Sequence, residues 1–202
     1  MSIIIAGIHT GIGKTICSAI ICQALGYDYW KPVQAGMENT DSDFIKNHVT
    51  NKACGIHKET YRLHTHASPH YAAEIENTEI KKENFILPDS SNNLVVETAG
   101  GLMSPLAKGF LNIDLVQQLQ LPVILVSNDY LGSINHTLLS HAALANRNIP
   151  VKGIVFNGNE TPSSRKYILE HTQLSLLLSI PSFEKTDATT IAQFAKTIHI
   201  KF

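Results

Sequence analysis

The chain has 202 residues, of which 44% are hydrophobic, and its formal net charge is −1 at pH 7. This size and apolar content suit one hydrophobic core, so we expect residues 1–202 to form a single domain. The balanced charge excludes a global attraction to nucleic acid or to an anionic membrane, and we expect neither as a partner. The three cysteines form no CxxC pair and no apolar run is long enough to span a membrane, which predicts a soluble cytoplasmic protein.

The first motif along the chain is the glycine-rich segment GIHTGIGKT, residues 7–15. An apolar run precedes it, and an apolar stripe at helical spacing over residues 13–25 follows it. Strand, glycine loop and helix in this order are the context of a phosphate-binding loop. The spacing is a variant, because the usual first small residue is replaced by Ile8 and the glycine lies one position earlier. A glycine-rich turn with a chance GKT is the alternative.

Each residue type in this loop suits a nucleoside triphosphate. Gly11 and Gly13 would let backbone amides approach the phosphates, toward which the following helix turns its positive end. Lys14 would reach the outer phosphates, and the Thr15 hydroxyl would bind a Mg²⁺ that bridges them.

A second strand is expected over residues 27–31, where it stops against Pro32. In open α/β sheets the ligand crevice lies outside the carboxyl ends of the strands. Lys31 is therefore a candidate for chemistry, and a solvated surface lysine is the alternative. A short helix should run from Asp43 to about residue 49, and Asp43 is either functional or an N-cap of that helix.

The least regular stretch covers residues 51–92, and a short helix is expected within it over residues 69–76. His64 and His66 would share one face of an extended segment, with His70 nearby, so a metal site is conceivable. No cysteine or carboxylate sits at ligand spacing, and ordinary loop histidines are the alternative.

A buried parallel strand is expected over residues 94–96, and Glu97 follows it directly, ahead of two glycines. Nucleotide-hydrolysing and nucleotide-transferring folds place a metal-organising acid at such a strand end. Glu97 is the strongest acid candidate, and a charged residue simply leaving the sheet is the alternative.

Helices and strands then alternate to the end of the chain. Helices are expected over residues 112–120, 133–147, 162–172 and 187–199, and strands over residues 122–127, 151–157 and 175–180. Strands separated by single helices predict an α/β fold with a doubly wound, mostly parallel sheet and helices on both faces, as in P-loop NTPases.

Seven sequence blocks resemble the dethiobiotin synthetase family, in the family's order. They are GIHTGIGKT, WKPVQAG at residues 30–36, DSDF at 41–44, ASPHYAA at 67–73, VETAGGLMSPL at 96–106, LPVILVSNDYLGSINHTLLS at 121–140 and VFNG at 155–158. The KPV and LGSINHTLLS blocks are far more specific than the glycine loop, because related ATPases lack them.

The resemblance implies an ATP-dependent ring closure in biotin biosynthesis. In that reaction CO2, derived from bicarbonate, adds to one amine of 7,8-diaminononanoate as a carbamate. ATP phosphorylates the carbamate, and the second amine displaces phosphate to form the cyclic urea of dethiobiotin. Carbamate and phosphoryl groups are both anionic, so such a site needs fixed cations.

The resemblance also assigns residues. Lys14 and Lys31 match the two active-site lysines, Thr10 lies near the carbamate, and Asn157 reads the adenine edge. Magnesium would be held by Thr15, Asp43 and Glu97. The nucleotide site would comprise Gly11, Ile12, Gly13, Lys14, Thr15, Ile16, Asp43, Glu97, Asn157, Pro181, Ser182 and Phe183. The substrate site would comprise Thr10, Lys31, Ala35, Leu131, Gly132 and Asn135, with residues 131–135 reaching over from the partner in a homodimer.

Four positions depart from the family pattern. His9 replaces an aspartate, Ala35 a serine or threonine, Thr98 a glycine and Gly158 an aspartate. These changes leave a catalytically repurposed relative as one alternative. The other is a nucleotide-switched regulatory ATPase of the partition or iron-protein type. Those proteins usually carry an additional lysine early in the loop, where this chain has Ile8 and His9.

Overall fold

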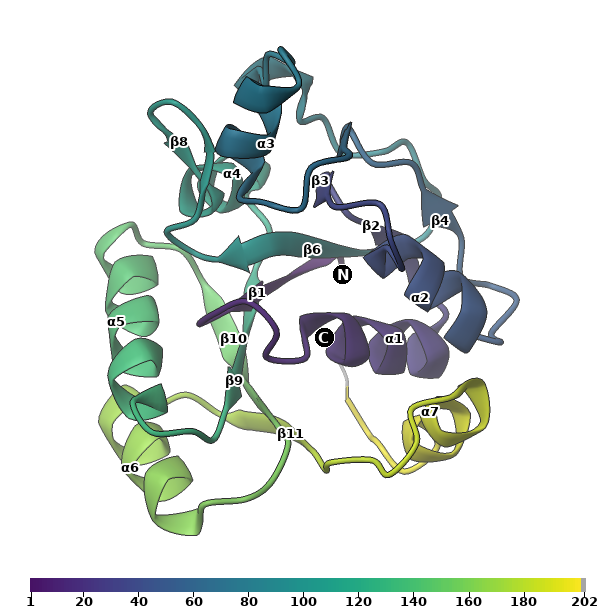
Figure 1. Ribbon diagram of the computed structural model, residues 1–202. Helices are drawn as coiled ribbons and strands as arrows, with labels where there is room; N and C mark the ends of the chain where they lie inside the picture. The colour runs from purple at the N-terminus through teal and green to yellow at the C-terminus, as the bar shows by residue number, and fades with distance from the viewer. Residues whose placement is uncertain (201–202) are drawn as a thin grey trace.

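A seven-stranded sheet runs through the middle of the computed structural model, which describes residues 1–200 (Figure 1). Its strand order is β11-β10-β9-β1-β6-β2-β4, and every neighbouring pair is parallel. The strands are β1 (Ile3–Gly7), β2 (Asp28–Trp30), β4 (Ile56–His57), β6 (Leu94–Gly101), β9 (Val123–Asn128), β10 (Val151–Asn157) and β11 (Leu176–Ile180). The predicted doubly wound parallel sheet is confirmed.

Two small sheets lie beside the main one. Strands β3 (Val33–Ala35) and β5 (Tyr61–Leu63) pair in parallel, and β7 (Pro105–Ala107) and β8 (Phe110–Leu111) form an antiparallel hairpin. None of these was predicted. Each has only two or three residues, which is too short for an alternating apolar pattern to be read.

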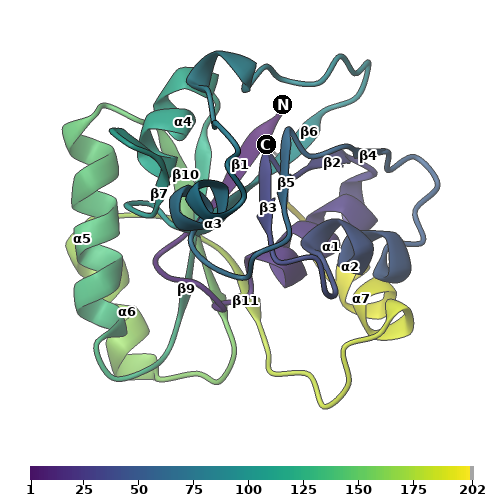
Figure 2. The ribbon, with the colours of Figure 1, turned by 45° about the horizontal axis from the view of Figure 1, so that its top comes forward.

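Helices cover both faces of the sheet. They are α1 (Lys14–Leu25), α2 (Asp41–His48), α3 (Pro69–Ile75), α4 (Asn112–Leu119), α5 (Ser133–Asn146), α6 (Pro162–Thr172) and α7 (Ala188–Ala195), with a 3-10 turn η1 (Lys82–Asn84). Figures 1 and 2 show α1, α2 and α7 together on one side of the sheet, and α4, α5 and α6 on the other. A salt bridge from Arg147 to Asp114 joins the end of α5 to α4.

The central strands are apolar because both of their faces are covered. All five residues of β1 are buried, as are the first five residues of β9. Such strands read as continuous apolar runs and not as alternating ones, which is why the sequence predicts them well. Trp30 and Tyr29 of β2 are among the largest fully buried side chains.

The topology reverses direction around β1. From β1 the chain builds outward to β2 on one side, and after β6 it crosses back to β9 on the other side. In sheets of this kind the crevice at the reversal point, outside the carboxyl ends of the strands, is where ligands bind. The glycine loop after β1 lies at that point.

Several boundaries differ from those predicted. Strand β6 extends to Gly101, because it continues to pair with β1 as far as Gly7, so Glu97 lies inside the strand and not at its end. Helix α2 begins at Asp41, since Thr40 is its N-cap. Helix α7 ends at Ala195, four residues before the predicted end. Within residues 1–200, no helix is both long and apolar enough to cross a membrane.

Asp28 joins the amino end of β2 to two loops. Its carboxylate accepts hydrogen bonds from the Gly55 amide at 2.8 Å and the Ser90 hydroxyl at 2.7 Å, and it contacts His57 Nε2 at 3.0 Å. Although burial opposes ionisation, the hydrogen bonds from Ser90 and Gly55 outweigh it and lower the pKa of the Asp28 carboxyl.

We predict that Asp28→Asn lowers the free energy of unfolding at pH 7 by about 1–3 kcal/mol, because donors are left facing an amide. A depressed carboxyl pKa stabilises the fold above the unfolded-state pKa, and this contribution is lost as the pH falls through the folded-state value. The difference in the free energy of unfolding between wild type and variant, measured by urea unfolding, should therefore become smaller below about pH 4. Exposed Asp89→Asn is the control. An equal gap at pH 7 and pH 3 would contradict this account.

Candidate active site

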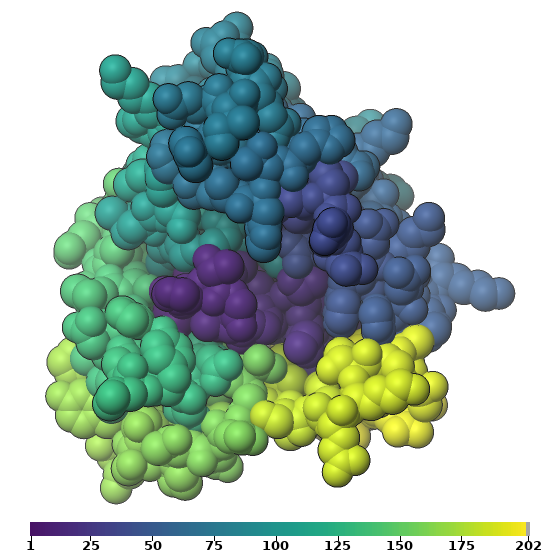
Figure 3. Space-filling view, viewed as in Figure 1, coloured from purple at the N-terminus to yellow at the C-terminus, as the bar shows by residue number. Residues whose placement is uncertain are grey.

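A pocket of about 830 Å³ opens at the carboxyl ends of the central strands. The glycine loop, the segment after β2, the β3 strand with the loop that follows it, and the segment between β5 and α3 all line it. Figure 3 shows the glycine loop, in purple, at the centre of this face, with blue and teal segments on one side of it and green and yellow segments on the other. Residues far apart in the sequence therefore meet at one opening.

The glycine loop is shaped by close approaches that a side chain would block. A Cβ on Gly7 would lie 2.9 Å from Lys14 Cδ, so the glycine one position earlier than usual leaves space for Lys14 to fold back. Gly13 has a φ of 93°, and a Cβ there would lie 2.2 Å from the Asn157 side chain. The Nδ2 of Asn157 donates to the Ile12 carbonyl at 3.1 Å, so it holds the loop from behind.

Lys14 is buried beneath its own loop. Its Nζ donates to the carbonyl of His9 at 3.1 Å. Burial, helped by repulsion from Lys31, lowers the pKa of Lys14 to about 8. An anion near Nζ would counter both effects, so the geometry favours a charged Lys14 once phosphate is present.

Glu97 is the buried centre of the site. Its Oε1 accepts from the Thr15 hydroxyl at 2.9 Å and from Lys31 Nζ at 3.1 Å. Its Oε2 accepts from the Ser18 hydroxyl at 2.8 Å and the Tyr29 hydroxyl at 3.0 Å. The residue is 1% exposed, so these contacts replace water and hold the carboxylate in one orientation.

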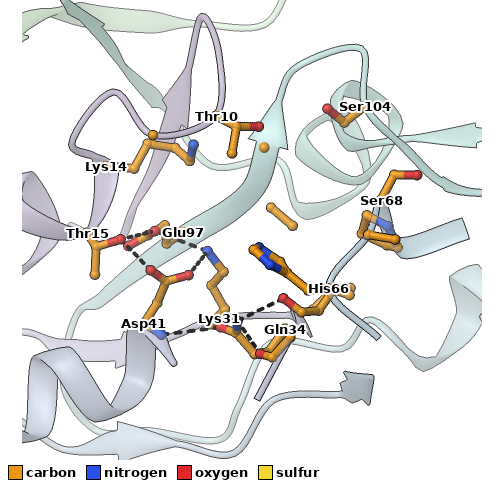
Figure 4. Close-up of a pocket in the computed structure, with 18 of the residues that line it drawn as sticks. Thr10, Lys14, Thr15, Lys31, Gln34, Asp41, His66, Ser68, Glu97 and Ser104 are labelled. Carbon is orange, nitrogen blue, oxygen red and sulfur yellow. Dashed lines mark hydrogen bonds and ion pairs between the residues drawn. The ribbon is translucent and has the colours of Figure 1, made fainter. Parts of the chain in front are cut away.

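Asp41 completes the group from the first turn of α2. It accepts from Thr15 Oγ1 and pairs with Lys31 Nζ, both at 2.5 Å. Burial opposes charge on both groups, but the carboxylates of Glu97 and Asp41 raise the pKa of Lys31, and Lys31 lowers the pKa of Asp41. We call Thr15, Lys31, Asp41 and Glu97 the acid–lysine cluster (Figure 4).

The structure corrects the prediction for Asp43. Its carboxylate accepts from the Thr40 hydroxyl at 2.6 Å, and its amide donates to the same Thr40 side chain at 3.1 Å. The Thr40 side chain thus caps the helix at the Asp43 amide, and Asp43 does not line the pocket. Residues two apart on a helix face different directions, so only Asp41 turns toward Thr15. The Thr-x-x-Asp spacing from Thr40 could have revealed the capping role from sequence.

The oxygen atoms of the cluster fit a magnesium ion. Thr15 offers a hydroxyl, and Asp41 and Glu97 offer carboxylates, which are the hard oxygen donors that Mg²⁺ takes in combination with substrate phosphates. The part of the chain that the structure describes holds no group of three or more His, Cys, Asp and Glu side chains placed to bind a metal. The conceivable histidine site at His64, His66 and His70 therefore does not form.

The other predicted site residues are dispersed. Thr10, Gly11, Gly13 and Ala35 line the pocket, whereas the remaining predicted nucleotide and substrate residues do not. Asn157 lies behind the loop, and Phe183 packs edge-on against Phe194 with ring centroids 5.5 Å apart. The outlying predicted residues are Ile12, Ile16, Asn157, Pro181, Ser182, Phe183, Leu131, Gly132 and Asn135.

The segment that begins α5 lies on the surface. Leu131 and Asn135 are exposed, and Gly132 is the N-cap of the helix in a left-handed conformation. Sequence reasoning missed Gln34, Ser18 and Tyr29. Their side chains are buried in the structure, but nothing in the apolar pattern or in the motifs of the sequence marks them as site residues.

Solved structures share the fold. A ParA family ATPase from Chlorobium tepidum matches with a TM-score of 0.63 at 11% identity, over 98% of this chain and 99% of that one. A plasmid partition protein from Borrelia burgdorferi matches with a TM-score of 0.59 at 15% identity, over 98% and 99% of the two chains. These similarities concern the fold alone.

Sequence relatives are much closer. A family model described as an AAA domain matches residues 1–190. The ATP-dependent dethiobiotin synthetase BioD of Cytophaga hutchinsonii is 47% identical over 95% of this chain and 93% of its own length. Proteins of the same name from Christiangramia forsetii (43%; 96% and 94%) and Lawsonia intracellularis (40%; 100% and 98%) match similarly. The chain therefore belongs to the ATP-dependent dethiobiotin synthetase family.

Proposed function

We propose that this protein is an ATP-dependent dethiobiotin synthetase, which closes the urea ring of dethiobiotin from 7,8-diaminononanoate and CO2 and releases ADP and phosphate. The observation that carries the proposal is the acid–lysine cluster beside a phosphate-binding loop, in a chain that is 47% identical to a relative of that name. Lys31 of the cluster and Lys14 of the loop place two lysines at one pocket, beside oxygen atoms that would hold a metal ion, as a reaction of anionic intermediates requires.

The first bond forms between one substrate amine and the carbon of CO2, with loss of a proton from nitrogen, and gives a carbamate. Lys31, charged through its contacts with Glu97 and Asp41, would bind the carbamate oxygens. Thr10 lines the same pocket and would add a hydroxyl donor.

The second step transfers the γ-phosphoryl group of ATP to a carbamate oxygen and releases ADP. Amides around Gly11 and Gly13 would hold the phosphates, and Lys14 would follow the negative charge as it moves. Thr15, Asp41 and Glu97 would hold Mg²⁺, which would neutralise charge on the phosphates. In the last step the second amine bonds to the carbamoyl carbon, the carbon–oxygen bond to phosphate breaks, and the amine loses its proton.

We further propose a homodimer in the cytoplasm. Exposed Leu131 and Asn135 at the start of α5 would meet the substrate bound by the partner. All three cysteines are free thiols, which suits a reducing compartment. Ile8 and His9 take the place of the early lysine of switch ATPases, so the regulatory alternative is not favoured.

Phosphate release and dethiobiotin formation, the latter followed by mass spectrometry, test the function. We expect release from MgATP only when diaminononanoate and bicarbonate are both present, with one dethiobiotin for each phosphate. Lys31→Ala should abolish product because the carbamate loses its cation, whereas Lys81→Ala, exposed and paired with Glu79, should not. Phosphate release without the diamine would point to a switch ATPase. Normal turnover by the Lys31→Ala variant would refute the role of Lys31 in carbamate binding.

A matched pair on α2 tests the metal assignment. We expect Asp41→Asn to slow product formation by about a hundredfold or more, because it removes a charge from the metal set. Asp43→Asn should stay near the wild-type rate and lose at most about 1 kcal/mol of stability through its cap. The reverse order of activities would restore Asp43 as the functional acid.

Tyr29→Phe tests how Glu97 is held. Burial and the neighbouring Glu97 raise the pKa of Tyr29, so its hydroxyl remains a donor to Oε2. Losing this bond frees the carboxylate to rotate, and we expect about tenfold more Mg²⁺ to be needed for half-maximal phosphate release. Tyr71→Phe, 52% exposed on α3, is the control. Identical magnesium curves for Tyr29→Phe and wild type would refute the positioning role.

A further inference from the structure

His66 lies in the wall of the active-site pocket, on the segment between β5 and α3. Figure 4 shows its imidazole pointing into the pocket on the side of Lys31. No step of the proposed reaction uses this ring. The spacing of the histidines in the sequence suggested only a metal site, and the described residues hold no such group.

The backbone holds His66 in this place. The β3–β5 pairing ends with the Gly36 amide donating to the Leu63 carbonyl at 2.9 Å, after which the chain turns over the pocket. Thr65 donates its amide to Glu76 Oε1 at 2.7 Å, and buried Pro69 begins α3. Anchors on both sides hold the backbone of the segment, which places exposed His66 at the pocket.

Gly36 makes room for the ring. Its φ is 82°, and a Cβ there would lie 3.1 Å from His66 Cδ2 and 3.3 Å from Cγ. The imidazole therefore packs on the Gly36 backbone, and its nitrogens remain at the pocket. Within residues 1–200, neither nitrogen makes a hydrogen bond with another residue.

The neighbouring polar groups are already engaged. Gln34 donates to the carbonyls of Ala35 and Gly36 at 3.3 and 3.0 Å and accepts from the Asp41 amide at 3.3 Å. Ala35 contributes only a methyl group. His66 is therefore a side chain on this wall with free hydrogen-bonding capacity toward a ligand.

The chemistry of the substrate indicates which of its groups the His66 imidazole can bind. Lys14 and Lys31 carry donors only and suit the anionic carbamate and phosphate. The second amine of the diamine must present its lone pair to carbon, so its N–H groups need an acceptor. Asp41 and Glu97 are taken up by Lys31 and Thr15, whereas an imidazole nitrogen can accept.

We propose that His66 is a substrate-binding residue, whose ring accepts a hydrogen bond from the amine of the diamine that closes the ring. This inference rests on the proposed function. It predicts selective weakening of diamine binding when the ring nitrogens are removed and the ring shape is kept.

The test compares His66→Phe, His66→Gln and the control His70→Ala, whose native ring does not line the pocket and pairs with Ser68. We expect His66→Phe to raise the KM for diaminononanoate about tenfold and to leave the KM for ATP unchanged. His66→Gln, which retains an acceptor, should recover most of the loss, and His70→Ala should match wild type. Melting temperatures verify that each variant is folded.

Two results would overturn the inference, and only one of them would also refute the proposed function. A wild-type protein that makes no dethiobiotin would refute the proposed function together with this role. Product formation by wild type with an unchanged diamine KM in His66→Phe, or with equal rises in both KM values, would refute the role of His66 alone.

Discussion

The contact of Lys31 with the two carboxylates of Asp41 and Glu97 is the interaction on which the site depends. Lys31 and Glu97 are nearly inaccessible to water, and a buried charge without a partner costs several kcal/mol, typically about 3–5 when one partner of a pair is removed. Ser18 and Tyr29 occupy the remaining Glu97 oxygen. The fold tolerates these buried charges because each of them has an ion-pair or hydrogen-bond partner.

This cluster also joins the elements of the fold. Thr15 comes from α1, Lys31 directly follows β2, Asp41 comes from α2 and Glu97 from β6, so the cluster links two helices and two strands. The reversal of the sheet around β1 brings the glycine loop beside them. A phosphate-binding loop alone binds nucleotides in many proteins, and in the proposed mechanism the second lysine with its acids directs this one toward a carbamate.

Much of this arrangement could be predicted from the sequence, for identifiable reasons. Buried parallel strands such as β9 and β10 are continuous apolar runs, and the GKT motif fixes Lys14 and Thr15 by local geometry. The choice between Asp41 and Asp43 could not be made from apolar periodicity, because it depends on where α2 begins. A capping interaction of Thr40 decides that start, and the helix then turns one acid inward.

His66 and Tyr29 illustrate what sequence patterns do not contain. The place of His66 depends on the pairing of two three-residue strands and on the positive φ of Gly36. The role of Tyr29 depends on β2 lying next to β6, a contact between residues far apart in the chain. Long-range pairing of this kind leaves no trace in local periodicity.

The crystal structure of the complex with ATP and Mn²⁺ in place of Mg²⁺ would test the account most directly. We expect one metal ion that contacts the Thr15 hydroxyl and the Asp41 and Glu97 carboxylates, directly at about 2.0–2.2 Å or through a single water. We also expect the triphosphate to lie on the glycine loop. A metal bound at Asp43, or a nucleotide held without contact to the acid–lysine cluster, would contradict it.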